Sequence, residues 1–172
     1  MYRTLRYLAL YLAVLLLQVF LFDNLSFGFY FSPLIYLAVI LLLPLDTPPI
    51  VLLAAGAAVG ISMDWAMGTA GINTIATLPT AFLRPTLLRL LYDDEKVREG
   101  GTPSPERMGR AVFFRYAAVC TLFHHTIFFL FDALSWALLP QTLLRIALSS
   151  AATLAAVWLL MRIFTAKHPA RI

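Results

Sequence analysis

Charged residues are scarce in this sequence. Lys, Arg, Asp and Glu make up 13% of the 172 residues, and hydrophobic residues make up 61%. An average soluble domain is about 25% charged. Apolar runs recur along the whole chain, and about 20 such residues in a helix cross a hydrocarbon core of about 30 Å. This composition excludes a soluble domain and predicts one all-α membrane domain over residues 1–172.

Several chemical signatures are missing as well. Cys120 is the single cysteine, which excludes a disulfide within the chain. The net charge is +4, but Lys and Arg lie beside apolar runs and form no soluble basic face, which argues against nucleic-acid binding. The sequence has no GxSxG, HExxH or Walker motif and no acidic pair at metal-binding spacing. We therefore expect no catalytic residue, metal or cofactor, and no enzymatic activity.

The apolar runs predict six membrane-spanning helices. The first follows Arg3 and Arg6, as in a signal peptide, but no small-x-small cleavage pattern comes after it, so we expect it to remain as a helix. Pro44 ends the second, because proline interrupts a helix, and the second and third spans are the short or interrupted ones. The predicted spans are about 5–22, 31–44, 50–67, 72–91, 112–138 and 142–164.

Basic residues set the expected orientation, because Lys and Arg beside membrane spans stay in the cytoplasm. Both termini, the 92–111 loop and the 165–172 tail are therefore expected in the cytoplasm. The loop is either a solvated connector or a docking surface for a cytoplasmic partner. Ser104 before Pro105 predicts the N-cap of a helix that runs on into the fifth span. The segments without Lys or Arg, expected outside, are 23–30, 68–71 and 139–141.

Three ionisable residues lie at a similar expected depth within the spans. Asp64, Asp132 and Arg145 fall within roughly 5–10 Å of the outer interface at a rise of about 1.5 Å per residue. A charge at this depth needs a partner or a wet cavity. We therefore predict a cluster in which Arg145 offsets one or both carboxylates. Such a cluster either fixes helix register or contacts a ligand or a charged residue of a partner.

The fourth span carries a polar face. Asn73, Thr77, Thr80 and Arg84 are spaced four, three and four residues apart, which puts them on one side of a helix that should face inward. Arg84 and Arg89 are expected to snorkel toward the cytoplasm, where anionic lipid head groups are available partners. The alternative use of this face is a site for an anionic ligand.

Two further features fall in the third and fifth spans. Gly56 and Gly60 form a GxxxG pattern, which favours close helix packing within the chain or with the helix of another protein. His124 and His125 point about 100° apart on a helix, and His125 is about 10 Å of rise from Asp132. We interpret the histidines as neutral groups bonded to neighbouring helices, with a proton relay or metal site as the alternative.

Three stretches carry a resemblance to a known family: FSPLIYLAVILLLPLD (31–46), GAAVGISMDWAMGTAGINTIATLPTAFLRP (56–85) and FRYAAVCTLFHHTIFFLFDALSW (114–136). In order and spacing they resemble the MreD family of rod shape-determining proteins, in its Bacteroidota-like version. The resemblance covers roughly residues 5–164.

This resemblance implies a non-enzymatic multi-pass subunit of the cell-elongation machinery in the bacterial cytoplasmic membrane. It implies a bitopic MreC-like partner, with the MreB filament, RodA and a transpeptidase nearby. The family's fold is similar to the S components of energy-coupling-factor transporters, six helices around a pocket. A transporter subunit of that kind is therefore the alternative, and it should contain a polar-lined cavity of about 300–1,000 Å³. No catalytic residue carries over from the family.

Overall fold

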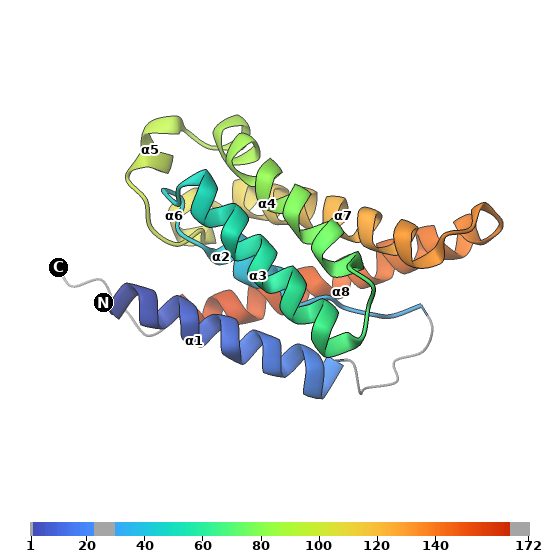
Figure 1. Ribbon diagram of the computed structural model, residues 1–172. Coiled ribbons are helices and arrows are strands. Elements are labelled where there is room, and N and C mark those ends of the chain that lie inside the picture. The colour runs from blue at the N-terminus through green and yellow to red at the C-terminus, as the bar shows by residue number, and fades with distance from the viewer. Residues whose placement is uncertain (1, 23–29, 166–172) are drawn as a thin grey trace.

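The computed structural model describes residues 2–22 and 30–165, and all regular structure in these ranges is helical (Figure 1). Three helical stretches, 49–67, 110–133 and 136–163, are long and apolar enough to cross a membrane. The predicted tail 165–172 lies outside the described residues except for Thr165, as does most of the 23–30 segment. The elements are α1 (Tyr2–Leu17), η1 (Gln18–Phe22), α2 (Leu37–Leu42), α3 (Pro49–Met67), α4 (Ile72–Leu91), α5 (Asp94–Arg98), α6 (Pro105–Met108), α7 (Arg110–Ala133), η2 (Trp136–Leu138) and α8 (Leu139–Thr165).

Helices α3 and α4 form a hairpin at the positions that the sequence predicts. Helix α3 begins at Pro49, whose fixed φ suits the first turn, and ends at Met67, after which Gly68 takes the left-handed conformation. Helix α4 follows after Gly71, also left-handed, and continues through two internal prolines. The glycines turn the chain within four residues, so α3 and α4 pack along one another.

The predicted helix 31–44 is wrong over its first half. Residues 31–34 have no regular secondary structure and follow an extended trace (Figure 1), and only Leu37–Leu42 form a helix, α2, in which every residue is buried. Helix α2 lies at the centre of the bundle and contacts α1, α3, α4, α7 and α8. Pro33 disfavours helical geometry at Ser32, and side chains of neighbouring helices capture the amides that a helix would use.

The ends of the last two long helices differ from the predicted bounds. Helix α7 ends at Ala133, where Leu134 takes a left-handed conformation, and η2 occupies the rest of the expected fifth span. The Ser104 hydroxyl does cap a helix, accepting from the Arg107 amide at 3.3 Å. That helix is the short α6, however, and Gly109 with φ 81° separates it from α7, so it does not run on into the fifth span.

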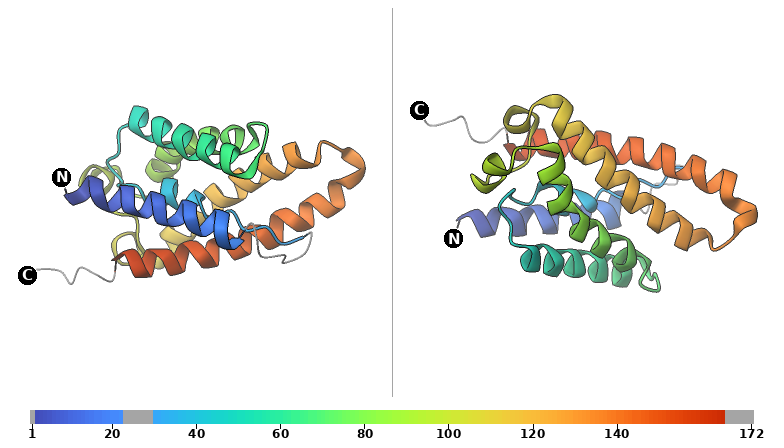
Figure 2. Two further views of the ribbon diagram at one scale, coloured as in Figure 1. Left: turned by 60° about the horizontal axis from the view of Figure 1, so that its bottom comes forward. Right: turned by 90° about the horizontal axis from the view of Figure 1, so that it is seen from above.

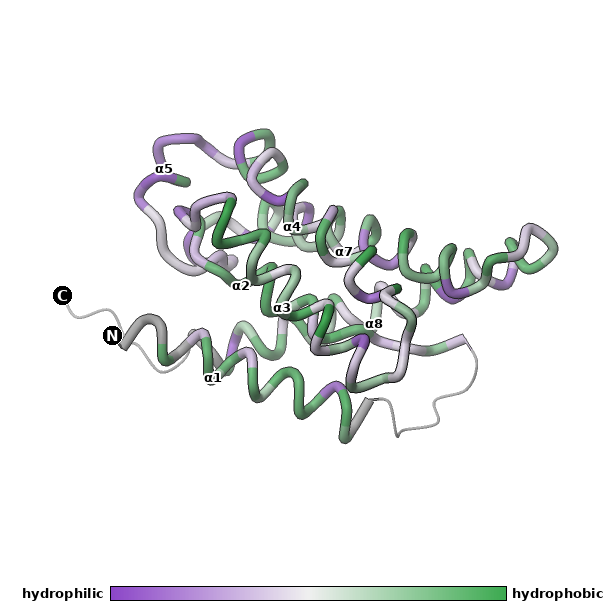
Figure 3. Tube along the Cα trace, in the orientation of Figure 1, coloured by the Kyte–Doolittle hydropathy of each residue, from purple (hydrophilic) through white to green (hydrophobic). Residues whose placement is uncertain are grey.

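The bundle has two distinct ends. The start of α1, the end of α8, and α5 and α6 lie at one end, which we call the basal end, and the α3–α4 turn and η2 lie at the other (Figure 1). The α7–α8 hairpin reaches beyond the other helices at that second end (Figure 2). Hydrophilic residues gather at α5 and the adjoining chain, whereas apolar residues dominate the long helices (Figure 3). Polar side chains within the bundle are therefore exceptions that need partners.

Candidate functional site in the bundle interior

Gln18 supports the extended segment from α1's side of the bundle. It is buried, its Oε1 accepts the Ile35 amide at 2.7 Å, and its Nε2 donates to the Pro33 carbonyl at 3.2 Å. One side chain thus replaces two backbone bonds that a regular helix would make within itself. A buried backbone group without a partner costs several kcal/mol in a membrane interior.

Two hydroxyls of α8 support the same segment from the opposite side. Ser149 Oγ accepts the Ser32 amide at 3.0 Å, and Thr153 Oγ1 accepts the Leu34 amide at 3.0 Å. Ser149 and Thr153 are four residues apart and both are buried, so they present one face of α8 to the segment. Alternate amides of an extended chain point the same way, which matches this spacing.

His125 extends this contact to α7. Its Nδ1 lies 2.9 Å from the Thr121 carbonyl, which can only accept, so Nδ1 carries a proton. In the neutral ring this leaves Nε2 as an acceptor for the Thr153 hydroxyl at 3.1 Å. Thr153 can therefore donate to His125 while it accepts from the Leu34 amide. His125 acts here as a helix-joining group.

His124 belongs to a second group, on the other side of α7. Its Nε2 lies 3.3 Å from both the Tyr36 hydroxyl and Thr77 Oγ1. Both hydroxyls already donate to Asn73, Tyr36 to the side-chain oxygen and Thr77 to the carbonyl, each at 2.7 Å. Nε2 of His124 is therefore the donor to these two oxygens, and its Nδ1 has no hydrogen-bond partner among the described residues.

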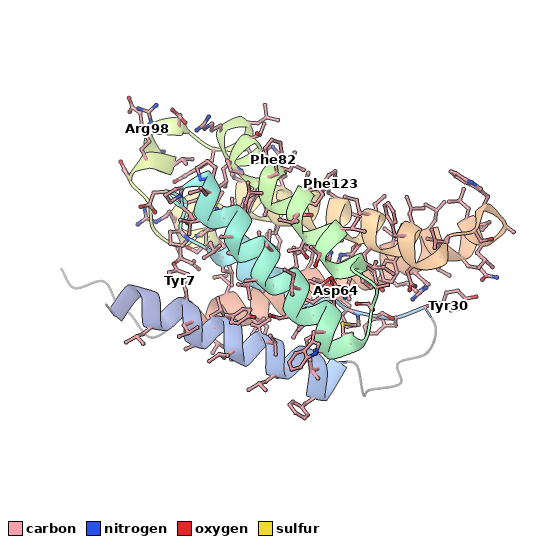
Figure 4. All side chains as sticks on the ribbon, in the orientation of Figure 1. Tyr7, Tyr30, Asp64, Phe82, Arg98 and Phe123 are labelled. Carbon is pink, nitrogen blue, oxygen red and sulfur yellow. The ribbon has the colours of Figure 1, made fainter. Side chains whose placement is uncertain are left out.

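Asp64 lies where the end of α3 meets the start of α4 (Figure 4). Its Oδ1 accepts from the Asn73 amide at 2.9 Å, the Asn73 side chain at 3.1 Å and the Thr69 hydroxyl at 2.6 Å. Its Oδ2 accepts from the Thr74 amide at 3.0 Å and from the Thr74 hydroxyl. The carboxylate thus caps the N-terminus of α4, where exposed amides and the helix dipole favour a negative charge.

The predicted cluster of Asp64, Asp132 and Arg145 is therefore only partly formed. Arg145 Nη1 lies 2.8 Å from Asp132 Oδ2, and the guanidinium sits 4.7 Å from the Phe129 ring centroid. Asp64 has the separate set of partners on α4 described above. Depth along a helix does not fix the direction in which a side chain points. Asp64 therefore does not join Asp132 and Arg145, although all three were expected at a similar depth.

Arg84 lies deep in the bundle rather than at a lipid surface, so the expected snorkelling is wrong for this residue. It is 1% exposed and donates to the carbonyls of Leu43 and Pro44, and its Nε donates to the Tyr116 hydroxyl at 2.7 Å. Tyr116 in turn donates to the Leu41 carbonyl at 3.0 Å. These carbonyls end α2, where a cation complements the helix dipole.

All four residues of the predicted polar face, Asn73, Thr77, Thr80 and Arg84, are buried. Thr80 donates to the Ala76 carbonyl of its own helix at 2.8 Å. Arg89, five residues beyond Arg84, is the exposed arginine of this helix, with 69% of its side chain accessible.

Gly56 and Gly60 face α4, which is therefore their packing partner within the chain. A Cβ on Gly60 would lie 2.6 Å from Thr74 Cα, and a Cβ on Gly56 would lie 2.9 Å from Ala81 Cβ. Helices α3 and α4 therefore approach each other more closely than any side chain at these positions would allow.

Sequence reasoning missed the residues that bind the backbone of 31–44. Their common signal is an isolated polar group in an apolar run, which predicts a partner but cannot name it. The missed residues are Gln18, Tyr116, Ser149 and Thr153.

The part of the chain that the structure describes contains pockets but no cluster of metal ligands. Among the described residues, no three His, Cys, Asp or Glu side chains gather as metal ligands. Three pockets bounded by described residues have volumes of about 280, 230 and 180 Å³, and neither Tyr36 nor His124 borders any of the three. No family model, curated protein or solved structure matches the chain. The described hydrogen bonds of the interior support the backbone of residues 32–44.

Proposed function

We propose that the protein is a non-enzymatic membrane scaffold of the rod-shape machinery, as its resemblance to the MreD family implies. It couples an MreC-like bitopic protein and the peptidoglycan synthase, RodA with a transpeptidase, to the MreB filament in the cytoplasm. The observation that best supports a scaffold is the use of the buried polar side chains. They bind backbone groups of residues 31–44 and one another, which gives a rigid body with fixed outer faces.

The proposed topology has six passes through the bacterial cytoplasmic membrane. Three are α3, α7 and α8, and the others are α1 with η1, the 31–46 segment with α2, and α4. An interrupted pass is tolerated in a membrane where protein surrounds it, and α2 is buried on all sides. The basal end, with α5 and α6, faces the cytoplasm because Lys and Arg concentrate in the 92–111 loop.

A transporter S component would use the interior differently. Its central volume would hold a small ligand, with several polar groups turned toward that volume. In this chain α2 occupies the centre, with Leu37–Leu42 all buried. The packing of α2 therefore favours the scaffold over the transporter subunit.

Depletion of the protein in the rod-shaped bacterium that carries it tests this proposal, together with affinity purification of a tagged copy from membranes. We expect cells to become round, re-expression to restore rods, and a bitopic protein with a large extracytoplasmic part to co-purify. Cells that stay rod-shaped and yield no such partner would contradict the scaffold role. Tight binding of a vitamin-sized molecule by the purified protein would favour the transporter subunit instead.

A further inference from the structure

A charged pocket of about 280 Å³ lies at the basal end, between the turn before α3, the end of α4, and α5. Its apolar members include Leu45, two prolines at the start of α3, and Val97. Its charged members come from three separate segments, and Arg98 marks its position on α5 (Figure 4). The charged residues of the wall are Asp46, Arg84, Arg89, Asp94 and Arg98.

The charges of the wall do not cancel. Three arginines and two aspartates leave one formal positive charge. Asp94 already serves two of the arginines, with Arg98 Nη2 at 2.9 Å and Arg89 Nε at 3.7 Å. Each guanidinium has five N–H donors, so Arg89 and Arg98 both keep donors that Asp94 does not use.

Arg84 adds a buried donor to this wall. Its five N–H groups make four hydrogen bonds, to the Tyr116 hydroxyl and to the carbonyls of Leu43 and Pro44. The fifth N–H, on Nη1, has no acceptor among the described residues. Arg84 therefore brings to the pocket a positive charge that carbonyl dipoles surround but no described carboxylate neutralises.

We propose that this pocket binds a phosphate group, supplied by the head group of an anionic phospholipid such as phosphatidylglycerol. A phosphodiester carries one negative charge, and its oxygens accept from Arg89 and Arg98 in the fork geometry that guanidinium favours. The prolines and Leu45 contact the start of the acyl chains.

The pocket lies at the level where such a lipid would be. Its lining residues come from the turn before α3, the end of α4 and α5, and hydrophilic residues gather at α5 (Figure 3). Anionic head groups of the cytoplasmic leaflet attract basic residues near the membrane surface. The proposal concerns lipid binding by the purified protein, and it stands whether or not the scaffold role does.

Native mass spectrometry of the detergent-purified protein tests the site. The probes are phosphatidylglycerol, phosphatidylethanolamine and inorganic phosphate. The test variant is Arg89→Gln with Arg98→Gln, and the matched control is Arg110→Gln with Arg115→Gln, two exposed arginines at the basal end of α7 outside the pocket wall. We expect phosphatidylglycerol to bind the wild type and the control alike, and to bind the test variant about tenfold more weakly.

The single variant Arg98→Gln is a control for misfolding, because 80% of that side chain is exposed and its loss should leave the fold intact. It should lose part of the affinity and keep the wild-type melting temperature. Equal binding of phosphatidylglycerol by test and control variants would overturn the site. Equal binding of phosphatidylethanolamine and phosphatidylglycerol by the wild type would overturn the preference for an anionic head group. Displacement of the lipid by millimolar inorganic phosphate would overturn the lipid as the source of the phosphate group.

Discussion

In the α3–α4 hairpin, two regular helices lie close together because Gly56 and Gly60 have no side chains between them. In the neighbouring 31–46 segment, the chain is extended for several residues and then forms only the six-residue α2. The hairpin satisfies most of its backbone within each helix, and Asp64 of α3 accepts two of the first amides of α4. The 31–46 segment instead takes bonds from side chains on α4, α7 and α8, and from Gln18 after α1.

The difference explains where the buried polar residues of this protein occur. A regular helix in lipid needs no outside partner for its backbone, so small residues suffice to pack it. An interrupted segment exposes amides at one end and carbonyls at the other, and each needs a partner. Side-chain oxygens of Ser149, Thr153 and Gln18 accept hydrogen bonds from backbone amides in 32–35. Arg84 and Tyr116 donate to backbone carbonyls in 41–44. The stability of the 31–46 segment should therefore depend on the polar side chains that bind its backbone. The stability of the hairpin should depend on its glycines, which let the two helices pack closely.

The largest effect should come from Arg84→Met. The change leaves the carbonyls of Leu43 and Pro44 and the Tyr116 hydroxyl without the donor that Arg84 supplies. We expect a loss of about 3–5 kcal/mol in the free energy of unfolding, measured by SDS titration in mixed micelles. Arg89→Met is the matched control on the same helix and should change stability by less than about 0.5 kcal/mol. Equal losses in both variants would mean that Arg84 does not support α2.

Gly60→Ala should come next and should affect the hairpin instead. The added methyl group meets Thr74 Cα at 2.6 Å, and backbone atoms at that contact cannot rotate away. We expect a loss of about 2–3 kcal/mol by the same titration, from overpacking. Gly56→Ala should cost less, because it meets the Ala81 methyl at 2.9 Å. Ala54→Val, on the exposed face of α3, should be close to neutral, and a cost as large as that of Gly60→Ala would contradict the packing described.

Gln18→Leu should have a smaller effect, of about 2 kcal/mol. It removes the acceptor of the Ile35 amide and the donor to the Pro33 carbonyl while it keeps side-chain volume. Thermal unfolding in detergent should show a lower midpoint for this variant. Gln141→Leu is the control, because Gln141 is exposed on α8. An unchanged midpoint for Gln18→Leu would show that the extended segment does not depend on this side chain.

The smallest effect concerns the pair between Asp132 and Arg145. A double-mutant cycle with Asp132→Leu and Arg145→Leu should give a coupling of about 0.5–1 kcal/mol, because 37% of the Asp132 side chain is exposed and solvent weakens the pair. The matched cycle of Asp64→Leu and Arg145→Leu should give no coupling, because Asp64 binds the start of α4. Coupling between Asp64 and Arg145 would contradict the separation of Asp64 from the Asp132–Arg145 pair.

Patterns of spacing predicted the regular part of this fold. The apolar runs located α3 and α4 to within a residue, and the spacing of Asn73, Thr77, Thr80 and Arg84 identified the buried face of α4. In each case the signal lies within one helix, since periodicity reports which residues share a side. The same reasoning identified Gly56 and Gly60 as packing positions, although it could not choose their neighbour.

The sequence marked the second span as short or interrupted, but it could not locate the interruption before α2 or name the partners of the histidines. LIYLAVILL reads as continuous helix, and the bonds that make the extended chain favourable come from residues far away, such as Ser149 and Thr153. Contacts across such separations depend on how each helix is rotated about its axis. That rotation also decided that Arg84 faces α2 rather than lipid and that Asp64 faces α4 rather than Arg145.

Hydrogen exchange of the protein in lipid nanodiscs tests most directly whether side chains hold the 31–46 segment in place. The amides of Ser32, Leu34 and Ile35 should exchange as slowly as those of α3, although they lie outside any helix, because each bonded amide must open before it exchanges. Fast exchange of these three amides while α3 remains protected would contradict the account.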